Sequence, residues 1–233
     1  MASADFAVEV WGKGALFTQP QAKIEKQTYS VITPSAASGL LKSVYWHPGL
    51  EYIIDAIQVC NPIQYGTIRV NGTTQVANIS TIKKHMDNPT NLNACCILPA
   101  RSRQQMFMVY LKDVRYIIHG HIFLNPNSGQ PNMSLDKAID ILNIRLRNGQ
   151  NWSQPFLGCR EFTAHIKPYE PGYLSFEECN PLLLGYTQLE PMLHFIEYRE
   201  STAVMPHFYR PAMIDGVIQV PNPQLWEKAV MNA

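Results

Sequence analysis

The stretch Tyr29–Tyr45, YSVITPSAASGLLKSVY, predicts a β-strand that runs directly into an α-helix. Thr33 is a good N-cap, because its hydroxyl can accept a hydrogen bond from an amide of the first helical turn. Pro34 follows at the first helical position, where its missing N–H is tolerated. The apolar positions after it recur at i, i+3, i+4 and i+7 and form one apolar face, made of Ala37, Leu40, Leu41 and Val44.

Three residues with polar ring side chains follow this predicted helix. Tyr45, Trp46 and His47 come directly after its last apolar position, and Pro48 and Gly49 end it. Such a cluster could serve packing alone, or it could place a phenol and an imidazole beside a ligand.

Alternating apolar and polar residues predict further strands on both sides of this unit. In order, the predicted segments are a strand over Phe6–Trp11, two strands within Ile53–Ile68 broken near Asn61-Pro62 and ending at the turn Asn71-Gly72, a long strand over Gln104–Leu124 bent near Lys112-Asp113, a helix from its cap Ser134 to Arg147, and an extended piece over Arg160–Ile166. With the organising helix, the order is β, α, β, β, α, β. That order is the one found in ferredoxin-like and RNA-recognition domains.

The predicted fold class is therefore α+β, with two domains. Residues 1–168 are expected to form a ferredoxin-like (RNA-recognition-motif-like) domain with an antiparallel sheet. Within it, residues 72–102 are polar and weakly patterned, and they predict a loop or insertion with one short helix. After Pro168, short apolar runs alternate with prolines, so residues 169–233 are expected to form a small β-rich C-terminal domain.

Composition narrows the class of protein. The chain has 233 residues, of which 46% are hydrophobic and 16% are charged, enough for a substantial core. No apolar run approaches the about 18 residues that span a bilayer, and the first residues lack the pattern of a secretory signal. The five cysteines are odd in number and include no Cys-x-x-Cys, which favours reduced, buried thiols in a cytoplasmic protein.

Charge is unevenly spread along the chain. Residues 1–168 carry 16 Lys and Arg against 10 Asp and Glu, whereas residues 169–233 carry 3 against 8. A basic front and an acidic tail would suit a polyanion on one part and a protein partner on the other. The alternative is an ordinary scatter of surface charge.

Several motifs taken together resemble the CRISPR-associated Cas-five proteins, in the Dvulg or subtype I-C branch. They span most of the first 165 residues in order: VEVWGKGALFTQP at 8–20, YSVITPSAASGLLKSVYWHP at 29–48, the Pro-Ile-x-Tyr-x-x-Ile-Arg run at 62–69, LKDVRYII at 111–118 and FLGCREFTA at 156–164. The resemblance implies a ferredoxin-like RNA-binding domain plus a small β domain. It also implies processing of precursor CRISPR RNA and retention of its 5′ handle within an interference complex.

The expected partners follow from this resemblance. They are the repeat RNA with its 5′ handle, and the backbone and large subunits of a type I-C complex, in a bacterial or archaeal cytoplasm. No cofactor and no membrane is expected.

Cleavage of RNA without a metal needs a base for the 2′-hydroxyl proton, an acid for the leaving oxygen and positive charge for the transition state. Histidine has an ordinary pKa near neutrality. His119 and His121 lie at i and i+2, hence on one face of a strand. By resemblance, Tyr45 lies together with one of them and orients or donates a proton, and the choice between the two histidines stays open. The alternatives are two surface histidines, or a metal site helped by His85, His165 or Cys159.

Basic and aromatic residues supply the candidates for RNA binding. Cations could contact phosphates, and aromatic rings could stack on unpaired bases. The candidates are Lys13, Lys23, Lys26, Tyr29, Lys42, Trp46, Arg69, Arg115, Tyr116 and Arg160. The alternatives are solvated surface charge for any single lysine and core packing for Trp46.

The sequence therefore predicts an RNA-binding subunit that cuts repeat RNA by metal-independent transesterification. A non-catalytic subunit that binds the handle and supports assembly is the main rival. Two departures from the family pattern favour the rival: Ser38 stands where the family commonly has Arg, and no lysine accompanies the histidines in IIHGH. A small metal enzyme using His119 and His121 is the third hypothesis.

Overall fold

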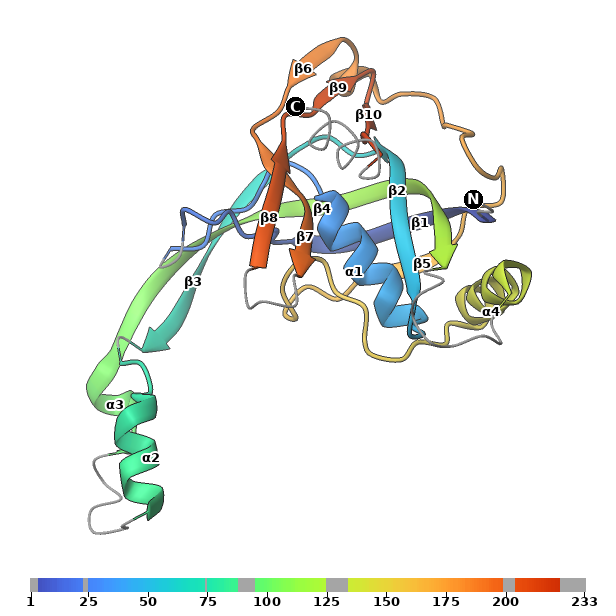
Figure 1. Cartoon of the computed structure of the whole chain (residues 1–233). Helices are drawn as coiled ribbons and strands as arrows, with labels where there is room; N and C mark the ends of the chain where they lie inside the picture. The colour runs from blue at the N-terminus through green and yellow to red at the C-terminus, as the bar shows by residue number, and fades with distance from the viewer. Residues whose placement is uncertain are drawn as a thin grey trace, which may run out of the picture.

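The structure is a computed structural model, and it describes residues 4–22, 25–73, 75–87, 95–124, 134–198 and 204–222. Its centre is an antiparallel sheet in the spatial order β5-β1-β4-β2-β10-β9-β6, with β3 paired to a separate part of β4 (Figure 1). The four strands that carry the site are β1 (Ala4–Ala15), β2 (Leu50–Val59), β4 (Arg103–Leu124) and β5 (His165–Pro168). The fold is thus mixed α/β with a mainly antiparallel sheet and few helices.

The two predicted helices are confirmed, with their caps. In α1 (Pro34–Val44), the Thr33 side chain accepts a hydrogen bond from the Ala36 amide at 3.1 Å. In α4 (Leu135–Asn148), Ser134 caps the start and Gly149, at φ 64°, ends it in the left-handed region that glycine tolerates.

The prediction of a strand directly before α1 is wrong. Tyr29–Ile32 belong to no strand. The Ser30 amide instead donates to the Glu190 carboxylate at 2.7 Å, and the Tyr29 amide donates to the Phe17 carbonyl at 2.8 Å. These side-chain and loop contacts replace the ladder that a strand would need.

The other predicted strands are found with shifted ends. β1 continues through Gly12 and Gly14, and the predicted break near Asn61-Pro62 separates β2 from β3 (Tyr65–Thr73). β3 runs past the turn expected at Asn71-Gly72. The extended piece predicted over 160–166 is a strand only from His165 onward.

The first half of β4 leaves the body of the protein. Asp113, at φ 45°, marks the predicted bend, and β3 pairs with β4 from Arg103 to Leu111. The two strands form an arm that projects from the rest of the molecule and carries α2 (Ile79–Asp87) and α3 (Pro99–Ser102) at its tip (Figure 1). The segment 72–102, predicted as a loop with one short helix, thus contains two helices in its described part, α2 and α3.

The chain after residue 168 returns to the central sheet. The short helix η3 (Pro181–Leu183) precedes β6 (Tyr186–Gln188), and β9 (Ala212–Ile214) and β10 (Val217–Gln219) follow. β10 pairs with β2, which makes one sheet of the segments before and after residue 168. A second, two-stranded sheet contains β7 (Met192–Tyr198) and β8 (Val204–Tyr209). The domain boundary at 168 stays a prediction.

The two faces of the central sheet differ. We call the first the helix-covered face, because α1 and α4 pack on it over a continuous apolar cluster that includes Phe6, Val8, Tyr52 and Ile118. The second is covered by residues 169–178, which we call the strap. Strap residues contact His119 and Gln58, whose side chains point away from the helices. Among the described residues, no helix is long and apolar enough to cross a membrane.

Candidate functional site

Both histidines of β4 lie on one face of the sheet, as the i, i+2 spacing predicts, and this face is the one that the strap covers. The Leu174 amide donates to Nδ1 of His119 at 3.0 Å. Nδ1 of His121 lies 2.8 Å from Oδ2 of Asp55, which is also contacted by Tyr173 of the strap. The strap therefore fixes the surroundings of both rings.

His119 is fully buried and cannot reach an RNA hydroxyl. It has 0% exposure and is surrounded by the rings of Tyr169, Tyr173 and Phe176. Because Nδ1 accepts the Leu174 N–H, the proton of the neutral ring is on Nε2, and that buried atom has no hydrogen-bond partner among the residues that the structure describes. Burial lowers the pKa of His119 to about 4, so it is neutral near pH 7.

His121 is the accessible member of the pair. Its side chain is 16% exposed, and that of Asp55 is 21% exposed. The Tyr173 hydroxyl donates to the same Asp55 oxygen, Oδ2, at 2.9 Å. A carboxylate can only accept, so Nδ1 of His121 donates and Nε2 is left as the ring atom that can accept a proton from a ligand.

Tyr45 lies on the opposite, helix-covered face. It is buried at the end of α1, the Arg145 guanidinium stacks over its ring at 4.9 Å, and Tyr52 donates to its carbonyl at 2.7 Å. Burial raises the pKa of its phenol. The expectation that Tyr45 lies together with one of the histidines is corrected here, because α1 packs on the face of the sheet that the histidine side chains do not occupy.

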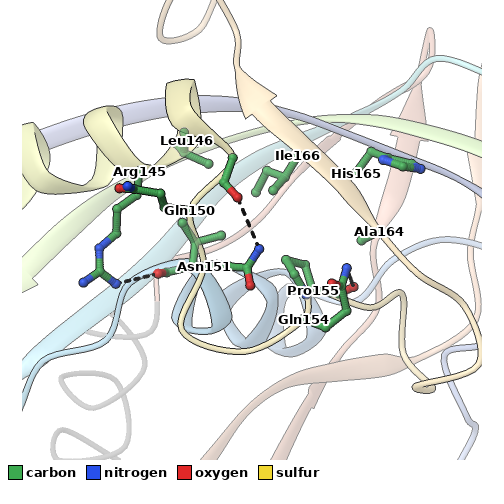
Figure 2. Close-up of a pocket in the computed structure, with 11 residues that line it drawn as sticks. Arg145, Leu146, Gln150, Asn151, Gln154, Pro155, Ala164, His165 and Ile166 are labelled. Carbon is green, nitrogen blue, oxygen red and sulfur yellow. Dashed lines mark hydrogen bonds between the residues drawn. The ribbon is translucent and has the colours of Figure 1, made fainter.

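A cavity of about 180 Å³ lies beside the end of α1, where α4 meets the start of β5 (Figure 2). Its polar lining comes from Arg145, Gln150, Asn151, Gln154 and His165. Arg145 donates to the Val44 carbonyl at 2.9 Å, and this contact satisfies the end of α1. Within the described part of the chain, no hydrogen bond joins His165 of this lining to a carboxylate, in contrast to the contact between His121 and Asp55.

The predicted RNA-binding residues divide by exposure. Lys13, Arg69 and Arg160 are exposed, and Trp46 is 55% exposed, so the packing alternative for Trp46 is wrong. Arg69 stacks over Phe107 on the arm at 5.1 Å. Lys26 and Lys42 are half-buried, and Lys23 lies outside the described residues.

Three of the predicted RNA-binding residues are engaged inside the fold. Tyr29 and Tyr116 are buried in the apolar cluster, where neither ring can stack on a base. Arg115 donates to the carboxylates of Glu9 and Glu177 at 2.7 Å, so it ties the chain after 168 to the sheet.

The Arg115 ion pairs shift the pKa of both carboxyl groups. Burial would raise the pKa of Glu9, but hydrogen bonds from Lys167 and Arg115 outweigh it and lower that pKa. The hydrogen bond from Arg115 is the main cause of the lowered pKa of Glu177. The basic front and the acidic tail thus meet within one molecule at this point.

The metal hypothesis gains no support in the described part of the chain. No three His, Cys, Asp or Glu side chains there are grouped so as to hold a metal ion. None of the five cysteines, all of which lie in the described part of the chain, forms a disulfide. Four are half-buried and Cys96 is exposed, so the prediction of buried thiols is wrong for Cys96.

Sequence reasoning missed Asp55 and Tyr173. Asp55 is the one charged residue in the apolar run Tyr52–Val59, YIIDAIQV. A carboxylate there is expensive to bury without a partner, and this signal could have identified it. Tyr173 had no comparable signal, because its partner is 118 residues away in sequence.

Solved structures of similar fold include a CRISPR-associated protein, at TM-score 0.65 and 24% identity, with 95% of this chain and 94% of that chain covered. A functionally uncharacterized protein from Streptococcus mutans matches at TM-score 0.65 and 23% identity, covering 97% and 96%. At these identities the likeness shows the fold alone.

Curated relatives are closer in sequence. A CRISPR pre-crRNA endoribonuclease Cas5d from Mannheimia succiniciproducens is 33% identical over 220 residues, 92% of this chain and 93% of the relative. A protein of the same name from Thermus thermophilus is 33% identical over 229 residues, 94% and 92%. Residues 6–221 match the family described as CRISPR-associated protein (Cas_Cas5). The chain therefore belongs to the CRISPR-associated Cas5 family.

Proposed function

We propose that this chain is a pre-crRNA endoribonuclease that binds CRISPR repeat RNA, cuts it, and stays on the 5′ handle as a subunit of a type I-C interference complex. The observation that carries the proposal is the near full-length match to two relatives named CRISPR pre-crRNA endoribonuclease Cas5d. His121, with an accessible ring held by Asp55, supplies a base of the kind that this reaction needs.

The fold supports an RNA-binding scaffold of the ferredoxin-like class. In chain order, β1, α1, β2, β4, α4 and β5 form the β, α, β, β, α, β series, and their strands lie in the order β5-β1-β4-β2. We assign residues 1–168 to this domain, with β3, α2 and α3 inserted as the arm. Residues 169–233 would be the smaller β-rich unit, docked through Arg115 and β10.

The proposed chemistry is metal-independent transesterification. Nε2 of His121 takes the proton of the 2′-hydroxyl, and the 2′ oxygen bonds to phosphorus. The bond from phosphorus to the 5′ oxygen breaks, and that oxygen takes a proton from water. The hydroxide that remains takes the proton held by His121, which restores the neutral ring. The products are a 2′,3′-cyclic phosphate and a 5′-hydroxyl.

Exposed cations and one exposed ring are the proposed contacts with the handle. Lys13 and Arg160 lie on the surface of the body, and neither has an ion-pair partner among the described residues. Trp46 offers a face for base stacking, and Arg69 is an exposed cation on the arm. The large and backbone subunits would meet exposed acidic residues after 168, such as Glu178, which has no ion pair with another described residue.

A second candidate function is a handle-binding scaffold without cleavage. It is favoured by the position of Tyr45, whose phenol is buried on the face opposite His121. In that case RNA binding would persist and precursor cleavage would belong to another protein.

The test is cleavage of the chain's own repeat RNA in EDTA by the purified protein, with the product ends identified. We expect cleavage to survive EDTA and to stop with a 2′-deoxy nucleotide at the scissile position, while binding persists. His121→Ala should lower the rate about a hundredfold or more. His207→Ala on β8 is the matched control, since His207 pairs with Glu197 in the second sheet. Binding without any cleavage would favour the scaffold, and cleavage of the deoxy substrate would refute the mechanism.

A further inference from the structure

We infer that Asp55 is a positioning residue, which together with Tyr173 holds the His121 ring so that Nε2 faces the RNA. The inference rests on the proposed function, in which His121 is the base. It assigns a role to two residues, one on β2 and one on the strap, that lie far apart in the sequence and meet only in the fold.

Asp55 stands at an irregularity of the sheet. Along β2, Ile54 pairs with Gly120 and Ala56 pairs with His119, so Asp55 is the extra residue of a β-bulge between them. A bulge redirects a side chain and is common beside active sites. The backbone of Asp55 is still used, because its carbonyl accepts the Val220 amide at 2.9 Å. The bulge therefore frees the carboxylate for His121 without leaving a gap in the sheet.

Gly120 makes the close approach of the two strands possible. A Cβ at this position would collide with the Ile53 carbonyl and the Phe6 ring. The residue between the two histidines thus has to lack a side chain for β2 to bring Asp55 beside β4.

Tyr173 fixes the carboxylate from the other side. Its hydroxyl donates to the oxygen that His121 contacts, at 2.9 Å. Burial, with the hydrogen bond to Asp55, raises the pKa of the phenol, so it keeps its proton as a donor throughout the neutral range. Asp5 is the other carboxylate nearby, exposed on β1 opposite His121.

The two histidines consequently hold opposite tautomers. His121 donates from Nδ1 to Asp55 and keeps its lone pair on Nε2, where it can act as a base. His119 accepts at Nδ1 from the Leu174 amide and carries its proton on Nε2. A role that only stabilised the fold would not require this difference, and it can be measured without any RNA.

The test measures three quantities on the full chain: the tautomer of His121 by ¹⁵N NMR of the imidazole, the single-turnover cleavage rate at saturating repeat RNA, and RNA affinity by filter binding. Asp55→Ala removes the acceptor, Asp55→Asn keeps a neutral one, and Tyr173→Phe removes only the donor to it. Asp140→Asn is the control, an equal loss of charge on the exposed side of α4.

We expect wild type to show an unprotonated Nε2 at His121, and Asp55→Ala to show a mixture of tautomers. The rate should fall about tenfold to a hundredfold in Asp55→Ala, less in Asp55→Asn and a few-fold in Tyr173→Phe, with affinity unchanged. Should Asp55→Ala fail to fold, the other two variants still decide the question.

Two outcomes would overturn the inference. One is a wild-type His121 with its proton on Nε2. The other is wild-type cleavage rates in both Asp55→Asn and Tyr173→Phe when His121→Ala is inactive. If wild type itself does not cleave, the proposed function fails, and the NMR measurement alone then decides whether Asp55 sets the tautomer.

Discussion

The two faces of the central sheet are built from alternating residues of the same strands, but the contacts that these residues make differ. On β4, Ile118 points into the apolar cluster under α1 and α4, whereas His119 and Ile117 point toward the strap. The helix-covered face contains a continuous cluster of aliphatic and aromatic side chains. The strap-covered face contains ion pairs and hydrogen-bonded rings.

This difference separates apolar burial from directional polar contacts in space. Apolar burial is non-directional and tolerates no charge, so a titratable group on the helix-covered face is sequestered, as the phenol of Tyr45 is. Hydrogen bonds on the strap-covered face are directional and can set the tautomer of a histidine. We expect substitutions on the two faces to fail in different ways.

The largest effect is expected on the helix-covered face. Ile118→Ala should lower the free energy of unfolding by about 4 kcal/mol, because the fully buried side chain leaves a cavity that helices cannot easily fill. Ile117→Ala is the matched control, equally buried but facing polar neighbours that can adjust, and it should cost about 2 kcal/mol. Urea unfolding of both variants measures the difference. Equal costs would show that the strap-covered face is packed as tightly as the other.

The strap-covered face should make stability depend on pH. Unfolded His119 binds a proton near pH 6.5, whereas the folded protein binds it only near pH 4. Between these values the unfolded state holds more protons, so stability falls as pH falls, by about 3 kcal/mol at pH 4. His119→Leu should remove this loss between pH 6.5 and pH 4. Above pH 6.5 it should change the free energy of unfolding by an amount that does not depend on pH.

The measurement is chemical denaturation at several pH values from 7 to 4. His194, whose pKa burial also lowers, remains in both proteins and cancels in the difference. Parallel curves for wild type and variant would mean that folding does not lower the pKa of His119.

Because Arg115 pairs with Glu177, the same charge reversal should change stability more at Glu177 than at its neighbour Glu178. Glu177→Lys places a cation against Arg115 and should cost about 2 kcal/mol, less than for a fully buried pair because Glu177 is 36% exposed and partly screened. Glu178→Lys, the same charge change at an exposed neighbour, should leave stability nearly unchanged. Thermal unfolding at low and high salt checks both, since salt should reduce the first effect. Only Glu178 is therefore a clean probe of docking to another subunit.

The smallest expected effect returns to the helix-covered face. Thr33→Ala removes the cap of α1 and should cost about 1 kcal/mol. Ser134→Ala removes the longer and exposed cap of α4, at 3.3 Å, and should cost about half as much. Denaturation midpoints of the two variants test the order, and a reversed order would mean that α4 contributes more to the core than α1.

The local parts of the fold could be predicted from the sequence. Caps and apolar spacing located α1 and α4, and alternation located β1 and β4, because these signals act over a few residues. Pairing between β2 and β10 had no such signal, since it joins distant segments with short apolar runs. The prediction of a strand before α1 was wrong because the Ser30 amide donates its hydrogen bond to a distant carboxylate, that of Glu190.

The candidate site was predictable in part. The i, i+2 rule placed His119 and His121 on one face, but it could not say that the first is completely buried and the second partly exposed. Tyr29, Tyr116 and Arg115 were plausible RNA contacts by residue type, yet burial and ion pairing depend on which segments meet in three dimensions. The family resemblance predicted that Tyr45 lies together with one of the histidines, whereas the packing of α1 separates them.

The pairing of β10 with β2 has a consequence for synthesis of the protein. β2 is made early, and its partner on one side, Val217–Gln219, is made only near the end of the described chain. During translation this edge exposes unpaired N–H and C=O groups, which invite pairing with another chain. We expect the yield of soluble protein to depend on translation speed, temperature and chaperone supply more than on the stability of the finished fold.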